Sequence, residues 1–237
     1  MTWQMLSEWD FIGSLLAIGL TLCAYLVALK VFSLANSFVL FHPILVGALL
    51  VALVGMISQV PYVQYQTSVQ PLNWLLGPVT VALAVPLYQQ LAVIYRTGSK
   101  GILVIAIGGC IAPISALTWF VLFDFSEPVQ KSILTKSITT PLAMDTAELL
   151  GGIPALAAAI VVITGIVGVV FSQFIFKLSG CNKPQAQGLA LGTIAHAIGT
   201  ARAQQISKQT AAFSTMALCI NGVLTAIILP FIMWLFG

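Results

Sequence analysis

The segment that decides the fold reads IPALAAAIVVITGIVGVVFSQFIF, at residues 153–176, and contains no charged side chain. About 20 consecutive apolar residues are enough for an α-helix to cross the hydrocarbon core of a bilayer. Because no water reaches that core, every backbone N–H and C=O group must be paired within the protein, which a helix achieves and an open strand does not. Residues 153–176 therefore predict a membrane-spanning helix.

The same pattern recurs along the chain. Five further apolar runs are clear, at residues 11–29, 38–58, 72–95, 101–123 and 210–236, and a weaker run lies at 187–201. Of the 237 residues, 59% are hydrophobic and 6% are charged, whereas soluble domains carry about 25% charged residues. We therefore predict an all-α polytopic membrane protein, a single membrane domain over residues 1–237 surrounded by the lipid bilayer.

The basic residues predict the orientation of the helices, because cytoplasmic loops of membrane proteins are enriched in Lys and Arg. The basic residues that follow or join the apolar runs are Lys30, Arg96, Lys100, Lys177 and Lys183. Placing them in the cytoplasm puts the N-terminus on the outer side. The net charge of +3 comes from scattered residues, so we expect no nucleic acid as a partner.

Residues 128–152 do not fit a simple count of crossings. The predicted orientation leaves both ends of this segment on the outer side, so the chain must enter the membrane and return. The charged residues Lys131, Lys136, Asp145 and Glu148 make the segment too polar for a plain span. Pro141 disfavours helical geometry in the residue before it. We predict a broken or re-entrant helical hairpin.

Two parts of the sequence resemble one another. Leu76-Gly77, Ala82 and Gln89-Gln90 recur at a constant shift as Leu191-Gly192, Ala197 and Gln204-Gln205. The alternative is a chance match, which apolar sequence produces easily. The predicted orientation supports a true repeat, because 38–58 runs outward and 153–176 runs inward. We therefore predict two inverted halves, residues 1–123 and 124–237, as in many secondary transporters.

Each half contains a run that is interrupted at a corresponding place. The interruptions are Gly77, Pro78 and Pro86 in the first half, and Gly188, Gly192, His196, Gly199 and Arg202 in the second. Proline removes a backbone donor and glycine weakens a helix, so both runs can unwind within the membrane. The N-terminal end of a half-helix then suits an anion. The alternative is that these residues only kink the helices and shape their packing.

Side chains near these breaks are candidates for binding a small carboxylate. Arg202 matches a carboxylate in a bidentate manner; the alternative is that it reaches the interface or pairs with Asp145. The hydroxyls of Thr139 and Thr140 can bond a substrate or simply cap the next helix. We predict these substrate-binding residues: Pro78, Thr139, Thr140, Gly192, Gly199, Thr200 and Arg202. His196 and Asp145 are candidates for proton coupling, and a structural hydrogen bond is the alternative for His196.

No motif indicates an enzyme, a metal or a cofactor. The four cysteines, Cys23, Cys110, Cys181 and Cys219, lack the spacing of a metal site or a redox pair. The sequence also lacks a Walker loop, a dinucleotide fingerprint and the residues of a Ser-His-Asp triad at recognisable spacing. We expect no metal, no cofactor and no enzymatic activity.

Three motifs resemble the LrgB/CidB family. They read LGPVTVALAVPLY at residues 76–88, KSITTPLAM at 136–144 and GLALGTIAHAIGTARA at 188–203. The resemblance covers nearly the whole chain, and the three motifs in this order are specific. His42-Pro43 departs from the Asn-Pro of the family pattern, which leaves the role of that position open.

The resemblance implies two functions. Bacterial members are described as holin- or antiholin-like regulators of murein hydrolase export and cell lysis, acting with a small LrgA/CidA-type membrane protein. Plastid relatives move glycolate and glycerate, and bacterial members are linked to small-carboxylate transport. Our first hypothesis is an alternating-access transporter of small monocarboxylates or 2-hydroxy acids, such as glycolate, glycerate, lactate or pyruvate; the holin-like pore or regulator is the alternative. We also expect a homo-oligomer in the bacterial inner membrane, with a periplasmic N-terminus.

Overall fold

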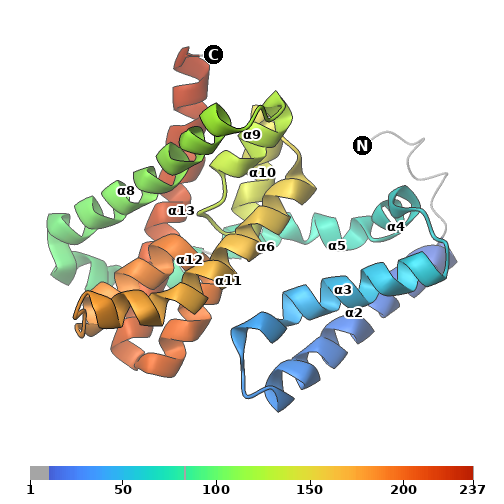
Figure 1. Ribbon diagram of the computed structural model, residues 1–237, viewed down its shortest axis with the longest axis horizontal. Coiled ribbons are helices and arrows are strands. Elements are labelled where there is room, and N and C mark those ends of the chain that lie inside the picture. The colour runs from blue at the N-terminus through green and yellow to red at the C-terminus, as the bar shows by residue number, and fades with distance from the viewer. Residues whose placement is uncertain (1–10, 83, 237) are drawn as a thin grey trace. The chain divides into compact units, whose positions relative to one another are not determined.

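A computed structural model of the chain describes residues 11–82 and 84–236, and every regular element in these residues is a helix (Figure 1). The prediction of an all-α fold is therefore confirmed. The chain divides into two compact units, residues 1–78 and 79–237, which are described separately below. The inverted repeat of residues 1–123 and 124–237 stays a prediction.

The first unit is built on a pair of apolar helices. Its elements are α2 (Phe11–Leu34), η1 (Val39–Phe41), α3 (Pro43–Ile57), α4 (Tyr62–Ser68) and α5 (Gln70–Trp74). The helices α2 and α3 lie side by side (Figure 1), and they approach closely because Gly47 faces the small residues Ala24 and Ala28. The hydroxyl groups of Thr21 and Tyr65, 2.8 Å apart, join α2 to α4.

The start of α3 explains the unexpected His42. His42 is the N-cap residue of α3, and its Nδ1 accepts a hydrogen bond from the backbone N–H of Ile44 at 3.4 Å. Pro43 occupies the first helical position, where its missing N–H costs nothing. An asparagine at an N-cap performs the same task, so the histidine preserves the helix start by a different acceptor.

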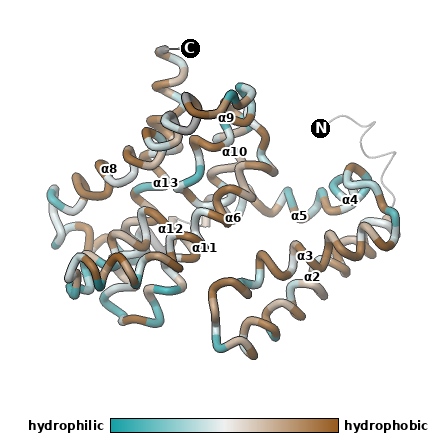
Figure 2. Tube along the Cα trace, viewed as in Figure 1, coloured by the Kyte–Doolittle hydropathy of each residue, from teal (hydrophilic) through white to brown (hydrophobic). Residues whose placement is uncertain are grey.

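Large apolar side chains cover α2 on all sides. Phe11 and Leu16 are 64% and 69% exposed, and the helix has few buried positions. Figure 2 shows hydrophobic residues along α2 and α3, with the hydrophilic ones gathered mainly at turns. A helix that is apolar all round is solvated by lipid or buried in a large core, and most of the α2 surface is not covered within its own unit.

The second unit is arranged around α13. Its elements are α7 (Ala84–Gln89), α8 (Leu91–Leu122), α9 (Glu127–Leu134), α10 (Thr140–Leu150), α11 (Pro154–Leu178), α12 (Pro184–Ile206) and α13 (Lys208–Phe236); α6 (Leu76–Ala82) spans the boundary between the units. Packed against α13 are α7, α8, α10 and α12. Ile105 of α8 is buried with Met216 and Ala217 of α13.

Four helices in the described residues are long and apolar enough to cross a membrane: Phe11–Leu34, Leu91–Ala116, Pro154–Leu178 and Lys208–Leu235. The chain is thus a multi-pass membrane protein. The run predicted at 72–95 differs from a single span, because α5, α6, α7 and the start of α8 divide it. A second break lies at Gly98 within α8, where φ is 65°.

The predicted break in residues 128–152 is confirmed. The helices α9 and α10 are separated by residues 135–139, and α10 ends at Gly151, which adopts the left-handed conformation that favours glycine. Glu127, exposed at the start of α9, pairs with the partly buried Lys131 in the last turn at 2.6 Å, and this ion pair lowers the pKa of Glu127. Whether the segment enters and leaves on one side of the membrane stays a prediction.

Candidate functional site

The helix α12 is broken in its middle, at His196. This residue has φ 40° and ψ −122°, a conformation that interrupts the helix and that non-glycine residues rarely adopt. In a straight helix, residues eight apart are separated by about 12 Å along the axis. Here a Cβ atom added at Gly199 would overlap the carbonyl oxygen of Leu191, eight residues earlier, so the helix bends sharply. The prediction of an interrupted helix at 187–201 is therefore confirmed.

The glycines before the break serve the packing of α12 on α13. A Cβ atom at Gly188 would overlap the carbonyl oxygen of Thr210, and one at Gly192 would overlap that of Ser214. Glycines four residues apart let two membrane helices approach closely. Gly188 and Gly192 therefore fit the alternative interpretation, that the glycines shape helix packing. The break in α12 lies at His196 instead.

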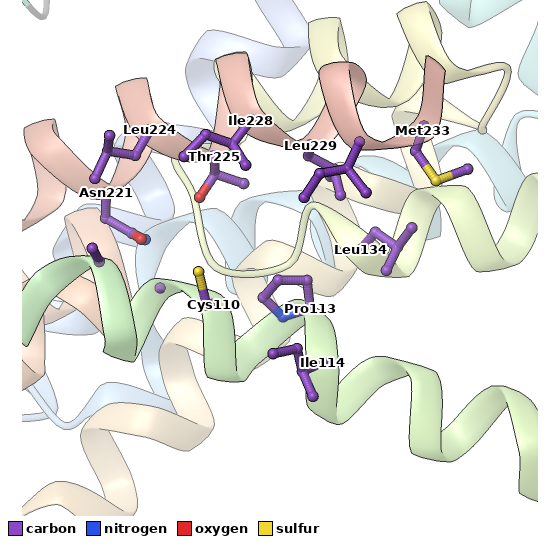
Figure 3. Close-up of a pocket in the computed structure, with 13 residues that line it drawn as sticks. Cys110, Pro113, Ile114, Leu134, Asn221, Leu224, Thr225, Ile228, Leu229 and Met233 are labelled. Atoms are coloured by element: carbon purple, nitrogen blue, oxygen red, sulfur yellow. The ribbon is translucent and has the colours of Figure 1, made fainter. Parts of the chain in front are cut away.

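The connection between α9 and α10 lies between α8 and α13. From α13, the Nδ2 of Asn221 donates to the carbonyl oxygens of Ser137 at 2.7 Å and Thr193 at 3.3 Å. From the other side, the Nζ of Lys136 donates to the Oγ of Ser115 in α8 at 3.1 Å. Figure 3 shows Asn221 extending from α13 toward α8, with the connection passing behind. These hydrogen bonds join α8 and α13 to the connection, and Asn221 also joins α13 to α12.

The break in α12 and the α9–α10 connection meet. The amide of Asn221 bonds the carbonyl oxygen of Ser137 in the connection and that of Thr193, three residues before the break at His196. Three buried atoms there have no hydrogen-bond partner among the described residues: the Oγ of Ser137, the Oγ1 of Thr139 and the Nε2 of His196. We call Lys136, Ser137, Thr139 and His196 the polar cluster.

The polar cluster is unusual for its burial. Ser137, Thr139 and His196 are only 2%, 5% and 2% exposed, and a buried polar atom without a partner costs about 1–3 kcal/mol. Such atoms are rare in native proteins. The unpaired hydroxyl and imidazole atoms are candidate contacts for a small polar molecule, whereas the Lys136 ammonium group donates to Ser115 of α8.

The structure brings some of the predicted site residues together. Thr139 and His196 belong to the polar cluster, and Thr140 is the first residue of α10 beside it. Gly192 and Gly199 lie on α12 in positions where a side chain would overlap the backbone.

Other predicted residues lie elsewhere or have another partner. Thr200 is buried, and its Oγ1 lies 2.9 Å from the Oγ of Ser214 in α13. Arg202 lies near the end of α12, where its Nη1 donates to the Oε1 of Gln205 at 2.6 Å. Asp145 is on the exposed face of α10. Pro78 is the last residue of the first unit, so it is not placed relative to the polar cluster.

Sequence reasoning missed three residues of this region. The sequence predicts no binding role for Lys136 and Ser137, which lie within the motif at 136–144, or for Asn221, which lies within the apolar run 210–236. The available signal for Asn221 was its amide in an otherwise apolar run, because polar residues within membrane helices are often functional or bonded to other helices.

An apolar pocket of about 270 Å³ lies beside Asn221 (Figure 3). It is bounded by α8 and α13, with Leu134 of α9 contributing to its wall. Cys110 and Pro113 approach it from α8, opposite Ile228 of α13. Within residues 11–82 and 84–236, no three His, Cys, Asp or Glu side chains are grouped as metal ligands.

Comparison with known proteins defines the family. An uncharacterized protein of Haemophilus influenzae (strain ATCC 51907 / DSM 11121 / KW20 / Rd) is 32% identical over 213 residues, 90% of this chain and 92% of its own length. The uncharacterized protein YxaC of Bacillus subtilis (strain 168) is 33% identical over 94% of this chain and 96% of its own.

A third relative carries a functional name. The antiholin-like protein LrgB of Bacillus cereus (strain B4264) is 27% identical over 93% of this chain and 96% of its own. No solved structure matches the chain. The sequence profile of the LrgB-like family matches residues 21–235, and the protein described here therefore belongs to the LrgB-like family.

Proposed function

We propose that this chain is an antiholin-like membrane protein that restrains the permeabilisation of the bacterial inner membrane by a small LrgA/CidA-type partner. The observation that carries the proposal is the match to relatives named antiholin-like protein LrgB over 93% of the chain. Since the match includes nearly the whole length of those relatives, the two sequences correspond along the entire membrane domain.

Reconstitution into liposomes tests this function. Vesicles loaded with a self-quenching dye and carrying the small partner alone should leak, and addition of this chain should lower the leak rate at equal total protein. The matched control replaces the chain with an unrelated multi-pass protein of similar size. If the chain leaves the leak rate unchanged or increases it, the antiholin-like function is wrong.

The polar cluster favours a second candidate function, the transport of small monocarboxylates or 2-hydroxy acids by alternating access. Secondary transporters bind their substrates at discontinuous helices, where half-helix ends and backbone groups become available. The supporting observation is that the break at His196 meets the α9–α10 connection at partnerless buried polar atoms. Proton coupling through His196 or Asp145 belongs to this candidate.

Flux measurements separate the two candidates. Vesicles with this chain should accumulate labelled glycolate, lactate or pyruvate with saturable kinetics, and unlabelled substrate should compete. A pore would instead pass unrelated solutes in proportion to their concentration. If none of the labelled acids enters, with or without the small partner, the transport candidate is abandoned and the antiholin-like function is unaffected.

A further inference from the structure

We infer that the groove formed by α2, α3 and α4 in the first unit is a binding site for a zwitterionic phospholipid of the phosphatidylethanolamine type. The acyl chains of this lipid lie along α3, and its headgroup lies at the turn between α3 and α4. The groove contains no residue of the polar cluster, so the lipid site does not depend on either candidate function.

The groove is large enough for a lipid. It has a volume of about 1180 Å³ and is lined along α3 from Pro43 to Met56, a length of about 20 Å in a helix. Small-molecule sites have volumes of about 300–1,000 Å³, and one leaflet contributes about 15 Å of hydrocarbon, half of the bilayer core. Another wall is α2, which is long and apolar enough to cross a membrane. The groove therefore matches the acyl layer of one leaflet in length and in depth.

The walls on α2 and α3 are apolar and contain small residues. Ala17 of α2 and Gly47, Ala48 and Ala52 of α3 line the groove. Ala48 and Ala52 are exposed within the first unit, so no side chain of this unit covers them. Small side chains let a neighbouring chain approach the helix backbone closely. An acyl chain supplies that contact.

The end of the groove at the α3–α4 turn is polar. Its lining there includes Ser58, Gln59, Tyr62, Gln64 and Tyr65. Tyrosine is enriched at the headgroup level of membranes. Within residues 11–82 and 84–236, the side-chain amides of Gln59 and Gln64 make no hydrogen bond. Both amides are therefore available to a headgroup.

The charge of the lining selects the kind of headgroup. The groove is lined by uncharged residues, and the sequence contains no Asp, Glu, Lys or Arg between Lys30 and Arg96. Anionic headgroups are bound by clusters of Lys and Arg, which this stretch lacks. A glutamine amide offers both donors and an acceptor. It can donate to the phosphate of a zwitterionic headgroup and accept from its ammonium group.

The backbone of Gln59 also indicates a task for its side chain. Its φ is 54°, and across it the N–H of Val60 donates to the carbonyl oxygen of Gly55 at 3.1 Å, as at helix ends that favour glycine. Glycine adopts this conformation without a steric cost. The glutamine is strained here, and its side chain lines the groove.

Photo-crosslinking of the full chain in nanodiscs of equal parts phosphatidylethanolamine and phosphatidylglycerol tests the site. Each lipid is added in trace amounts with a diazirine on the same acyl chain, and the crosslinks are mapped by mass spectrometry. Residues 43–56 should be labelled at least about threefold more by the phosphatidylethanolamine probe, the effect of one hydrogen bond. Residues 154–178 are the internal control and should be labelled equally by both probes.

Two matched pairs of variants test the lining. Gln64→Ala should lower the labelling of residues 43–56 by the phosphatidylethanolamine probe at least about threefold, whereas Gln66→Ala, exposed on the same helix outside the groove, should not. Ala48→Phe narrows the groove and should lower the labelling by both probes. Leu49→Phe is its control, because Leu49 is exposed and does not line the groove. Equal effects within both pairs would overturn the inference.

Gln59→Gly separates binding from folding. Glycine favours the backbone conformation, so the midpoint of thermal unfolding should stay equal or rise, while the preference for the phosphatidylethanolamine probe should fall. An unchanged preference in both Gln59→Gly and Gln64→Ala would show that the amides do not select the headgroup, and would overturn the inference. Residues 43–56 that remain unlabelled in the unmodified chain would show that another helix covers the groove, with the same consequence.

Discussion

The side-chain amide of Asn221 in α13 donates a 2.7 Å hydrogen bond to the main-chain carbonyl of Ser137 in the α9–α10 connection. Asn221 is 2% exposed, so this bond is made away from water. Within the connection and the start of α10, the carbonyls of Thr135 and Thr139 accept bonds from Ile138 and Ala143. The carbonyl of Ser137 instead takes its donor from α13, so the amide of Asn221 fixes the connection next to the polar cluster.

Replacement of Asn221 by leucine should destabilise the protein by about 1–3 kcal/mol, because the carbonyl of Ser137 loses its buried donor. The measurement is the midpoint of thermal unfolding in detergent, followed by circular dichroism. Asn182→Ala is the control, since Asn182 is exposed in the loop before α12 and should have little effect. Equal midpoints for the two variants would show that the bond does not support the fold.

Gly192→Ala should destabilise the protein by about 1–3 kcal/mol, because overpacking forces α12 away from α13. The added methyl group would overlap the carbonyl of Ser214 and lie 2.9 Å from the Cβ of Ala217. Gly19→Ala is the control: nothing lies within 4 Å of its added Cβ, and alanine favours a helix by up to about 1 kcal/mol over glycine. A Gly192→Ala variant that stays fully stable but loses ligand binding would return Gly192 to the predicted substrate site.

The sequence predicts the features that depend on neighbouring residues. The apolar runs at 11–29, 153–176 and 210–236 coincide with helices because the bilayer requires long, uncharged and internally hydrogen-bonded segments. The break before Pro141 could also be predicted, because proline restricts the residue that precedes it. Each of these conclusions uses only local chemistry.

The position of the break in α12 could not be predicted in the same way. Glycine both weakens a helix and permits close packing, and the sequence does not say which property is used. Gly188 and Gly192 are packing positions against α13, whereas His196 adopts the positive φ. The contact with α13 decides between the two uses, and it depends on tertiary structure.

The polar cluster depends on partners that are distant in sequence. Lys136 bonds Ser115 in α8, and Asn221 in α13 bonds Ser137. Periodicity reveals which residues share a helix face, but not which helices become neighbours. Charge type alone favours Arg202 as the anchor, whereas the fold half-buries Lys136 and bonds its ammonium group to Ser115 of α8.

A double-mutant cycle on Thr200 and Ser214 should give a coupling energy of about 0.6 kcal/mol and at most about 1.7 kcal/mol, the range of interhelical hydrogen bonds in membranes. The two hydroxyl groups are 2.9 Å apart and buried. The free energy of unfolding of Thr200→Val, Ser214→Ala and the double variant provides the measurement. The control cycle combines Thr200→Val with Thr215→Val. The Thr215 hydroxyl bonds the carbonyl of Ala211 within α13, so this pair should show no coupling energy.

A coupling energy near zero for Thr200 and Ser214, together with a raised substrate KM in Thr200→Val, would contradict the structural role of this pair. It would instead support Thr200 as the substrate-binding residue that the sequence predicts. If the Thr200–Ser214 coupling energy is as small as that of the Thr200–Thr215 control, the hydrogen bond between Thr200 and Ser214 does not stabilise the protein.

The last prediction compares the two cations that compete for the role of substrate anchor. Arg202 donates to Gln205 in its own helix. For Lys136, no carboxylate oxygen among the described residues lies within 4.0 Å of its Nζ. Lys136→Gln should lower the carboxylate flux into vesicles at least about tenfold, as for a lost charge-assisted bond, whereas Arg202→Gln should change it by less than about threefold. The measurement is the initial rate of labelled lactate uptake at equal amounts of inserted protein. If flux is instead lost in Arg202→Gln and retained in Lys136→Gln, the guanidinium of Arg202 is the anchor. Its hydrogen bond to Gln205 would then have to break during transport to free Arg202 for the substrate.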